Sequence, residues 1–396
     1  MKVNDNAVAE FLSLGFVLGD DTFREGEKAE RIVDVLEFET NRKSSVSDVE
    51  ESLKVSLEYA VRDKKNVAIH LSGGKDTRLI VTLAHALGLD FTAVTYGEKG
   101  SVDIEIAKKV AKKMQVRHKI YEITPNDFSV NNIYEVAKGT DGLVPFTSLV
   151  GGYQSDKKTF PGFDVVLAGA LMSEIMDTWD FKKYPQDPLE AMKKRWGYLP
   201  ILKAEYMSYI DDKLKDMYDG KSLEEILCET TIKNLFLRSL GFYIAREINI
   251  CPVVLDTAVL SNVYSLPLSK RRNCYLAKKI IKRVKPELLY LPYSYSGYMI
   301  PLAFPYIIHQ GLRVIHTRGK KVFFGPANIA DHLRYTLRDF IESKINTLDI
   351  DLVRPDMANN LLQEHLAGDY NTSAIGRLVT LKIWMEEFVD DVKHKS

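Results

Sequence analysis

Residues 72–77, SGGKDT, place a serine, two glycines, a lysine, an acid and a threonine in six consecutive positions. Glycines let backbone amides approach an anion with no Cβ in the way. Ser72 and Thr77 can add hydroxyl donors and Lys75 a positive charge, while Asp76 can hold a magnesium ion between phosphates or cap a helix. This combination indicates a site for phosphate groups.

The flanking residues indicate which elements position this stretch. Residues 66–71, NVAIHL, form a short apolar, β-branched run that predicts a buried strand. Residues 77–87 carry apolar side chains at helical spacing. The reactive stretch therefore lies on a strand-to-helix turn, where free N–H groups and the positive end of the helix dipole attract anions. A glycine turn that only connects the two elements is the alternative, and the lysine and acid beside the glycines favour the anion site.

The surrounding pattern predicts an α/β fold with a parallel sheet. Strand-like and helix-like segments alternate between residues 66 and 168, and such alternation is typical of parallel strands joined by crossover helices. Ligands bind such sheets beyond the carboxyl ends of the strands, where Ser72, Tyr96 and Gly169 are expected. After residue 180 the pattern is mostly helical. We expect strands at 66–71, 91–97, 117–123 and 165–169, and helices at 77–87 and 102–114.

Composition excludes several classes of protein. The 396 residues include 54 basic and 54 acidic side chains, so nothing indicates a general binder of nucleic acid or of anionic membranes. We find no signal peptide and no apolar run of about 20 residues that would cross a bilayer. Three widely spaced cysteines argue against a disulfide framework. These features favour a cytoplasmic protein.

The turn also resembles a known signature. Residues 72–77 are similar to the SGGxDS motif of the PP-loop ATP pyrophosphatases, which cleave ATP between the α and β phosphates and transfer AMP to a substrate oxygen. A Walker A sequence, GxxxxGK[ST], is absent. The resemblance implies adenylylation instead of phosphoryl transfer, with ATP and Mg²⁺ as the cofactors.

Within that group the chain resembles the synthetase domain of asparagine synthase over most of its length. The resemblance implies an adenine nucleotide alpha-hydrolase-like (PP-loop, Rossmann-like) core followed by a mostly helical C-terminal region. It divides the chain into a connector-like segment (1–60), an ATP-binding core (61–180) and a helical substrate-side region (181–396). The segments that carry it are TYG (95–97) with GSVD (100–103), GALMSE (169–174, the family's GxGxDE), CPVVLD (251–256, its PFLD box) and RLVTLKIWMEEF (377–388).

The N-terminal residues bear on the source of nitrogen. Residues 11–22 resemble the connector that follows the glutaminase domain in glutamine-using members. Position two is Lys2, where a glutaminase of this type needs a nucleophilic cysteine. We therefore expect no glutaminase activity, and nitrogen would arrive as ammonia, as a substrate amine or from a separate glutaminase subunit. The sequence leaves self-association open.

The resemblance assigns roles to particular residues. It implies catalytic roles for Lys75, Asp76 and Glu174, with Asp76 as the metal ligand. Asp103 could equally cap the helix that follows it, and Glu174 could be only a helix acid. We expect His70 to be a core histidine. The residues expected to contact ATP are Leu71, Ser72, Gly73, Gly74, Lys75, Asp76, Thr77, Thr95, Tyr96, Gly97, Asp103 and Gly169.

Two departures from the family pattern affect the acceptor. Ser173 replaces the metal-binding aspartate of the GxGxDE loop, and a later family lysine aligns with residues 293–298, YSYSGY, which contain no cation. Lys75 is one candidate to supply the missing charge. The others are Lys278, Lys279, Arg271 and Arg272.

The sequence therefore predicts an AMP-forming amide ligase that adenylylates a carboxylate and transfers nitrogen to it. Aspartate is the favoured carboxylate and ammonia or an amine the nitrogen donor. Two alternatives stay open, a tRNA-modifying PP-loop enzyme and a non-catalytic nucleotide-binding homologue. Balanced charge and the lack of an RNA module argue against nucleic acid as a partner.

Overall fold

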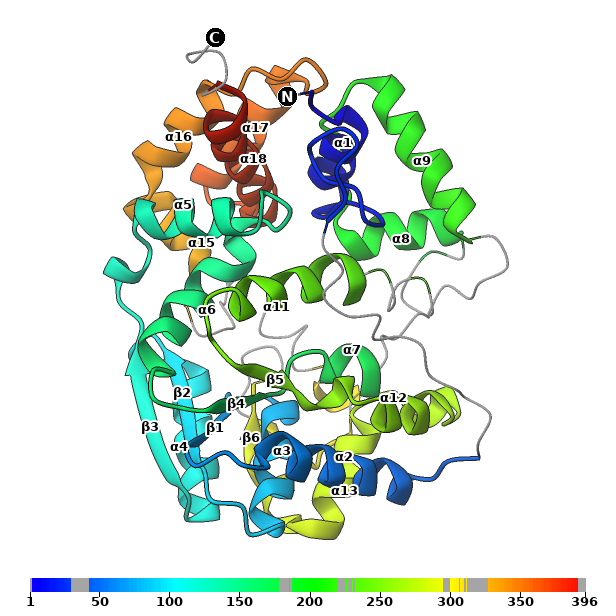
Figure 1. Cartoon of the computed structure of the whole chain (residues 1–396), viewed down its shortest axis with the longest axis vertical. Coiled ribbons are helices and arrows are strands. Elements are labelled where there is room, and N and C mark those ends of the chain that lie inside the picture. Colours follow the sequence, from blue (N-terminus) through cyan, green and yellow to red (C-terminus); the bar gives the residue numbers. More distant parts are fainter. Residues whose placement is uncertain are drawn as a thin grey trace.

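A computed structural model describes residues 2–29, 43–177, 185, 187–218, 226, 230, 232–294, 300–305, 307–309, 311 and 327–390. Within this part of the chain a five-stranded parallel sheet has the order β3-β2-β1-β4-β5 (Figure 1). This order reverses direction beside β1, as in doubly wound α/β folds. The strands are β1 (Val67–His70), β2 (Thr92–Gly97), β3 (Arg117–Glu122), β4 (Val165–Ala168) and β5 (Ile250–Pro252).

The predicted α/β class is confirmed, and the first four strands lie where the sequence placed them. The fifth strand was not predicted. β5 has only three residues and pairs with β4 through Val166 and Ile250. A strand this short shows no period of its own, so its pairing with β4 is what defines it.

Side chains alternate between the two faces of the sheet, because successive strand residues point in opposite directions. Ile69 and Leu167 enter a large apolar cluster on one face. Ala68 and Val166 lie in a small cluster with Phe160 on the other. The helices whose residues enter the large cluster are α2 (Val46–Val61), α3 (Lys75–Ala86), α4 (Val102–Met114), α7 (Met172–Met176), α12 (Thr257–Tyr264) and α13 (Tyr275–Val284), together with Leu237 at the start of α11 (Leu237–Ile244).

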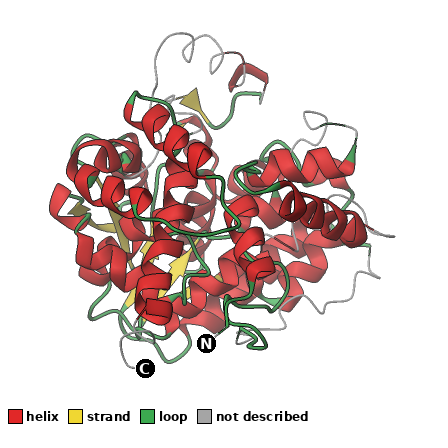
Figure 2. Ribbon diagram, turned by 90° about the horizontal axis from the view of Figure 1, so that it is seen from above, coloured by secondary structure: helices red, strands yellow, loops and turns green. Residues whose placement is uncertain are grey.

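A second large apolar cluster lies beyond the opposite face and consists of helices from distant parts of the chain (Figures 1 and 2). Helix α18 supplies much of its centre and contacts α1, α5, α6, α16 and α17. The helices of this part are α1 (Asp5–Leu14), α5 (Val130–Gly139), α6 (Phe146–Thr159), α8 (Pro188–Trp196), α9 (Ala204–Tyr218), α11 (Leu237–Ile244), α15 (Ile329–Asp331), α16 (Arg338–Asn346), α17 (Pro355–Leu366) and α18 (Thr372–Met385).

A buried arginine links the first helix to the last long one. The guanidinium of Arg377, on α18, donates to the carbonyls of Leu12 (3.1 Å) and Ser13 (2.7 Å) at the end of α1. It also donates to the carbonyls of Trp196 and Gly197 at the end of α8. Three helices distant in sequence thus share one buried cation.

The remaining elements are short. Two strands, β6 (Pro292–Tyr293) and β7 (Ile300–Pro301), form an antiparallel pair. Among the described residues no helix is both long and apolar enough to cross a lipid bilayer. The 3-10 turns lie at Pro125–Asp127, Val253–Leu255, Leu268–Lys270 and Pro286–Tyr290, and π-helical turns at Ile232–Phe236, His332–Thr336 and Glu386–Asp390.

Candidate active site

The phosphate turn, residues 72–77, connects β1 to α3 as predicted. Gly74 is the N-cap of α3, and no side chain caps this helix end. The capping alternative for Asp76 is therefore wrong, because its carboxylate is engaged elsewhere. The uncapped amides of the first turn face the carboxyl edge of the sheet, which suits an anion.

Hydrogen bonds within the turn fix its shape. The Ser72 amide donates to Thr77 Oγ1 (3.0 Å), and the Gly74 amide donates to Ser72 Oγ (3.1 Å). The Gly73 amide donates to Asp103 Oδ1 (3.0 Å). Asp103 lies within α4, whose N-cap is Ser101, so the N-cap alternative for Asp103 is wrong. A phosphate oxygen that binds the Gly73 amide must displace this carboxylate.

Arg78 fixes a second segment against the turn. Its buried guanidinium donates to the carbonyls of Leu288 (3.0 Å), Leu291 (3.1 Å) and Pro292. The same segment continues to Ser294, whose amide donates to the Gly73 carbonyl (2.9 Å). Residues 295–298 of the YSYSGY run lie outside the described residues.

Lys75 lies at the centre of a polar network. Its Nζ contacts both carboxylate oxygens of Asp76 (3.0 and 3.2 Å), donates to Ser173 Oγ (2.7 Å) and lies 3.4 Å from Asp177. The Lys75 side chain is only 10% exposed. Burial alone would lower the pKa of Lys75, but Asp76 and Asp177 outweigh it, so the pKa is raised. Lys75 is therefore an ammonium ion at neutral pH.

The other candidate cations with described contacts have different partners. Lys278 donates to the Phe304 carbonyl (2.7 Å), and Arg271 stacks on Tyr264 and donates to the Ile175 carbonyl. Lys75 itself hydrogen-bonds to Asp76 and Ser173, which places its charge between the two loops.

Residues 169–174, the second loop, connect β4 to α7 and lie against the phosphate turn. Ser173 Oγ donates to Asp76 Oδ2 (2.5 Å). Leu171 has φ +67°, a left-handed backbone that a side chain rarely adopts and that the family pattern assigns to glycine. Glu174 is a first-turn acid of α7, and burial raises its pKa. The two loops together surround the Lys75 ammonium with oxygen atoms.

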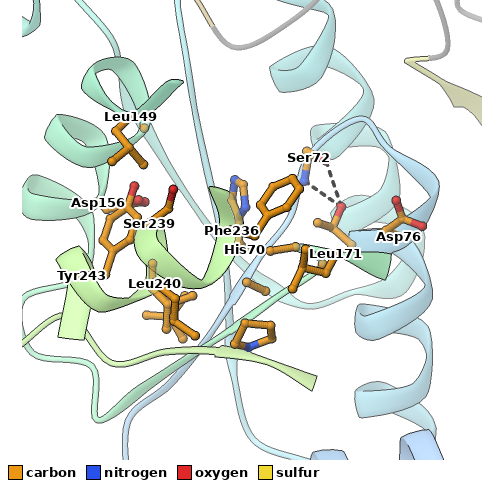
Figure 3. A pocket seen from close by; sticks show the side chains of 18 of the residues that line it. His70, Ser72, Asp76, Leu149, Asp156, Leu171, Phe236, Ser239, Leu240 and Tyr243 are labelled. Atoms are coloured by element: carbon orange, nitrogen blue, oxygen red, sulfur yellow. Dashed lines mark hydrogen bonds between the residues drawn. The ribbon is translucent and has the colours of Figure 1, made fainter. Parts of the chain in front are cut away.

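A cavity of about 460 Å³ begins at the two loops and continues between the sheet and helices α6 and α11 (Figure 3). Ser72, Asp76 and Leu171 lie at one end. Leu149, Asp156, Ser239 and Tyr243 lie at the other. His70 lies between the two ends (Figure 3). Its ring stacks on that of Tyr96, which also lines the cavity, with the ring centroids 4.7 Å apart. The cavity is mostly apolar, with polar groups gathered at its two ends.

Residues 48–226 match the asparagine synthase family. The matched segment holds the phosphate turn, the second loop and most of the cavity lining. The predicted relation to asparagine synthase is therefore confirmed for this part of the chain.

Three individual relatives match parts of the chain. The 7-cyano-7-deazaguanine synthase of Ralstonia pickettii (strain 12J) is 34% identical over 92 residues, which are 21% of this chain and 41% of that protein. The NH3-dependent NAD synthetase of Campylobacter jejuni has a TM-score of 0.28 at 15% identity, over 49% of this chain and 96% of its own. The NMN synthetase of Francisella tularensis has a TM-score of 0.25 at 16% identity, over 58% and 96%.

The asparagine synthase segment brings most of the predicted ATP-binding residues together at its carboxyl edge, in the phosphate turn, Tyr96, Asp103 and Gly169. Two predicted ATP-binding residues, Thr95 and Leu71, do not line the cavity. The Thr95 hydroxyl instead donates to the Leu71 carbonyl (2.5 Å) and hydrogen-bonds with His118 Nε2. Gly97 lies against Ser101, where a Cβ would be 2.6 Å from Oγ. The family match supports an ATP-using synthetase or ligase.

Some cavity residues were not predicted. His70 lines the cavity, and burial lowers its pKa to about 4, so the ring is neutral. Asp156 is 4% exposed and lines the opposite end. Its sequence context, QSDKK, looks like a solvated helix face, so no local signal separates it from its neighbours. Only the packing of α6 and α11 on the sheet reveals it.

Asp76 is poorly placed to be part of a protein-held metal site. No group of three or more His, Cys, Asp or Glu side chains in the described residues is arranged to hold a metal ion. Both oxygens of Asp76 contact Lys75. Magnesium often binds through one or two carboxylates and the substrate's phosphates. A single carboxylate of this kind would fit an ion that arrives on the nucleotide, and Asp76 would have to exchange a contact with Lys75 for it.

Gly169→Ala is expected to weaken ATP binding about tenfold. A Cβ at Gly169 would lie 3.0 Å from the backbone nitrogen and from Cγ2 of Thr77, so the second loop would have to move away from the phosphate turn. Gly151→Ala is the control, because its Cβ would meet Phe128 at an ordinary 3.5 Å. Titration with ATP by calorimetry would measure the change, and equal affinities in the two variants would contradict it.

Proposed function

We propose that this protein is an ATP-dependent, AMP-forming amide ligase of asparagine synthase type. Its favoured reaction joins aspartate and ammonia, with ATP converted to AMP and pyrophosphate. The observation that carries the proposal is the phosphate turn with the Lys75 ammonium buried in it, at the mouth of a cavity large enough for a small acceptor. The asparagine synthase match over this segment supports it.

In the first step a carboxylate oxygen of the acceptor bonds to the α-phosphorus, and the bond to the bridging oxygen of the β-phosphate breaks. Negative charge then accumulates on the departing pyrophosphate. Lys75 and the amides of Gly73 and Gly74 would stabilise it, once Asp103 leaves the Gly73 amide and Ser72 Oγ leaves the Gly74 amide. Mg-ATP would be the substrate form, and Asp76 would be the residue that holds its ion, which would neutralise charge on the phosphates.

In the second step an amine nitrogen attacks the acyl carbon, AMP leaves with the bonding electrons, and the nitrogen loses a proton. A carboxylate is a poor acyl donor and an acyl-adenylate a good one, which is why the first step is needed. The mostly apolar cavity would slow attack by water on the adenylate.

The similarity to 7-cyano-7-deazaguanine synthase supports a second candidate, in which a PP-loop enzyme of another class adenylylates a planar heterocycle. The stacked rings of His70 and Tyr96 offer such a ligand a flat surface inside the cavity. A tRNA-modifying enzyme belongs to the same candidate class. Ser173 in place of the family aspartate keeps a non-catalytic homologue as a third reading.

The deciding experiment measures pyrophosphate and AMP release from Mg-ATP by the purified protein. We expect release with L-aspartate plus ammonium, little with either alone, and none in Asp76→Ala. Replacing ammonium by glutamine tests whether a separate glutaminase subunit is needed. Absence of release with aspartate would exclude that acceptor, and the same assay with heterocyclic acids or tRNA would then decide between the other candidates.

A further inference from the structure

The end of the cavity opposite the phosphate turn contains a buried carboxylate. Asp156, on α6, is 4% exposed, and its partner is the side chain of Tyr243 on α11. Ser239 and Leu149 lie beside it in the cavity wall (Figure 3). A carboxylate this deep is costly unless a donor or a cation meets it.

The cavity itself offers Asp156 no cation. No lysine or arginine lines it in the described residues, and its histidine, His70, is neutral because burial lowers its pKa to about 4. Lys157 and Arg246 lie around a neighbouring cavity of about 440 Å³ that Asp156 also borders. Both of these cations approach Glu135 within ion-pair distance.

Two tyrosine hydroxyls near Asp156 can accept hydrogen bonds from a ligand that carries N–H donors. The Tyr243 hydroxyl hydrogen-bonds to Asp156, and a Cβ built on Gly152 would lie 3.5 Å from that hydroxyl and 3.6 Å from the one of Tyr96. The hydroxyls of Tyr96 and Tyr243 therefore both lie within 4 Å of the Cβ position at Gly152, and Asp156 acts electrostatically on Tyr96. A carboxylate with two phenolic oxygens close by is a suitable set of acceptors for an ammonium group, which has up to four N–H donors.

We propose that Asp156, with Tyr243, binds the protonated amino group of a substrate at this end of the cavity. The inference rests on the proposed function and names the chemistry of its co-substrate. The amino group has two sources: the free nitrogen donor, as ammonium or an alkylamine, or the α-amino group of an amino-acid acceptor. An α-amino group would place its cation opposite to the phosphates, with the acceptor carboxylate between. A free donor would itself supply the reacting nitrogen, and would have to return one proton to the Asp156 carboxylate before it attacks the acyl carbon.

Binding of a cation by Asp156 requires its carboxyl group to release a proton. In the empty cavity, burial raises the pKa of Asp156 to about 8, so the carboxyl group is neutral at pH 6 to 7. An ammonium group that pairs with the carboxylate must release that proton, so its affinity rises with pH. The other titratable groups around the two cavities that Asp156 borders are His70, Asp76, Tyr96, Glu135, Lys157, Tyr243, Arg246 and Glu247.

The experiment measures binding by calorimetry with probes that differ only in the amino group. Comparing the affinities for methylammonium chloride and potassium chloride tests whether the bound amino group is that of a free nitrogen donor. Comparing L-aspartate with succinate tests whether it is the α-amino group of an amino-acid acceptor. We expect the wild-type protein to prefer the amine in one pair by at least tenfold, and Asp156→Asn to lose that preference. Glu135→Gln, which removes a carboxylate outside this cavity, should retain it.

A second measurement requires no variant. In the wild-type protein the affinity for the preferred amine should rise about tenfold per pH unit between pH 6 and 7.5, because one proton leaves for each amine bound. No preference in either pair, a preference that survives in Asp156→Asn, or a flat pH profile would overturn the proposal. These titrations contain no ATP, so a failure of the proposed ligase activity would appear separately, as absence of pyrophosphate release.

Discussion

Lys75→Met is expected to lower the rate of pyrophosphate release about 100- to 1,000-fold, with the protein still folded. Methionine retains the length and apolar stem of the lysine and removes its charge. The lost ammonium contacts Asp76 and Ser173, so the departing pyrophosphate would meet the Asp76 carboxylate with no protein cation beside it. Repulsion would then add to the loss of stabilisation.

The size of this effect follows from burial. Lys75 is 10% exposed, so water cannot replace its charge as it would at the surface. Initial rates at saturating Mg-ATP and acceptor would measure the loss, and urea unfolding would show that the variant is folded. Lys344→Met is the matched control, since Lys344 is a similarly covered lysine that pairs with Glu386 far from the site. A Lys75→Met rate within threefold of wild type would contradict the assigned role.

Asp156→Asn is expected to make the ligand-free protein more stable at neutral pH. Burial raises the folded-state pKa of Asp156 to about 8, while the unfolded chain ionises near its ordinary value of about 4. Between these values the folded state holds a proton that the unfolded state lacks, so wild-type stability falls as pH rises from about 4 to about 8. Asparagine cannot ionise and escapes this loss.

Between pH 4 and pH 7 the wild-type protein loses about 4 kcal/mol of its free energy of unfolding in this way, at about 1.4 kcal/mol per pH unit. The asparagine variant avoids that loss, but its weaker hydrogen bond to Tyr243 would cost about 1 kcal/mol. We therefore expect a gain of about 3 kcal/mol at pH 7 and almost none at pH 5. Urea unfolding of both proteins at the two pH values would measure it. A variant less stable than wild type at pH 7 would show that the Asp156 carboxylate is ionised and paired in the free protein.

The sequence predicted the parts of the fold that depend on local pattern. Helix α4, Val102–Met114, has the bounds that its apolar spacing indicates, and the turn from β1 to α3 follows from its glycines and flanking periodicity. Its cap shows the limit of such reasoning, because Ser101 and Asp103 are both good N-cap residues and only the backbone geometry selects Ser101. Local preference identifies an element more reliably than its end.

The parts of the site that come from distant contacts were not predictable. β5 exists because it pairs with β4, and Asp156 faces the cavity because α11 packs across from α6. The contact between Lys75 and Ser173 joins residues 98 positions apart. The sequence motifs indicated that the two loops that carry these residues belong to one site, but not that their side chains hydrogen-bond to each other. Which residues meet across a sheet edge depends on the whole fold.

The Arg377 guanidinium has a consequence for the order in which the protein can fold as it is made. Its hydrogen bond to Ser13 spans 364 residues, so α1 leaves the ribosome long before the side chain that donates to its last carbonyls is made. Until then the apolar face of α1, including Phe11 and Leu12, has no partner on α18 to cover it. A nascent chain of this protein therefore keeps the part of α1 that packs on α18 uncovered until its last helices are made, even after α9 has been synthesised. A chaperone would be needed at that stage.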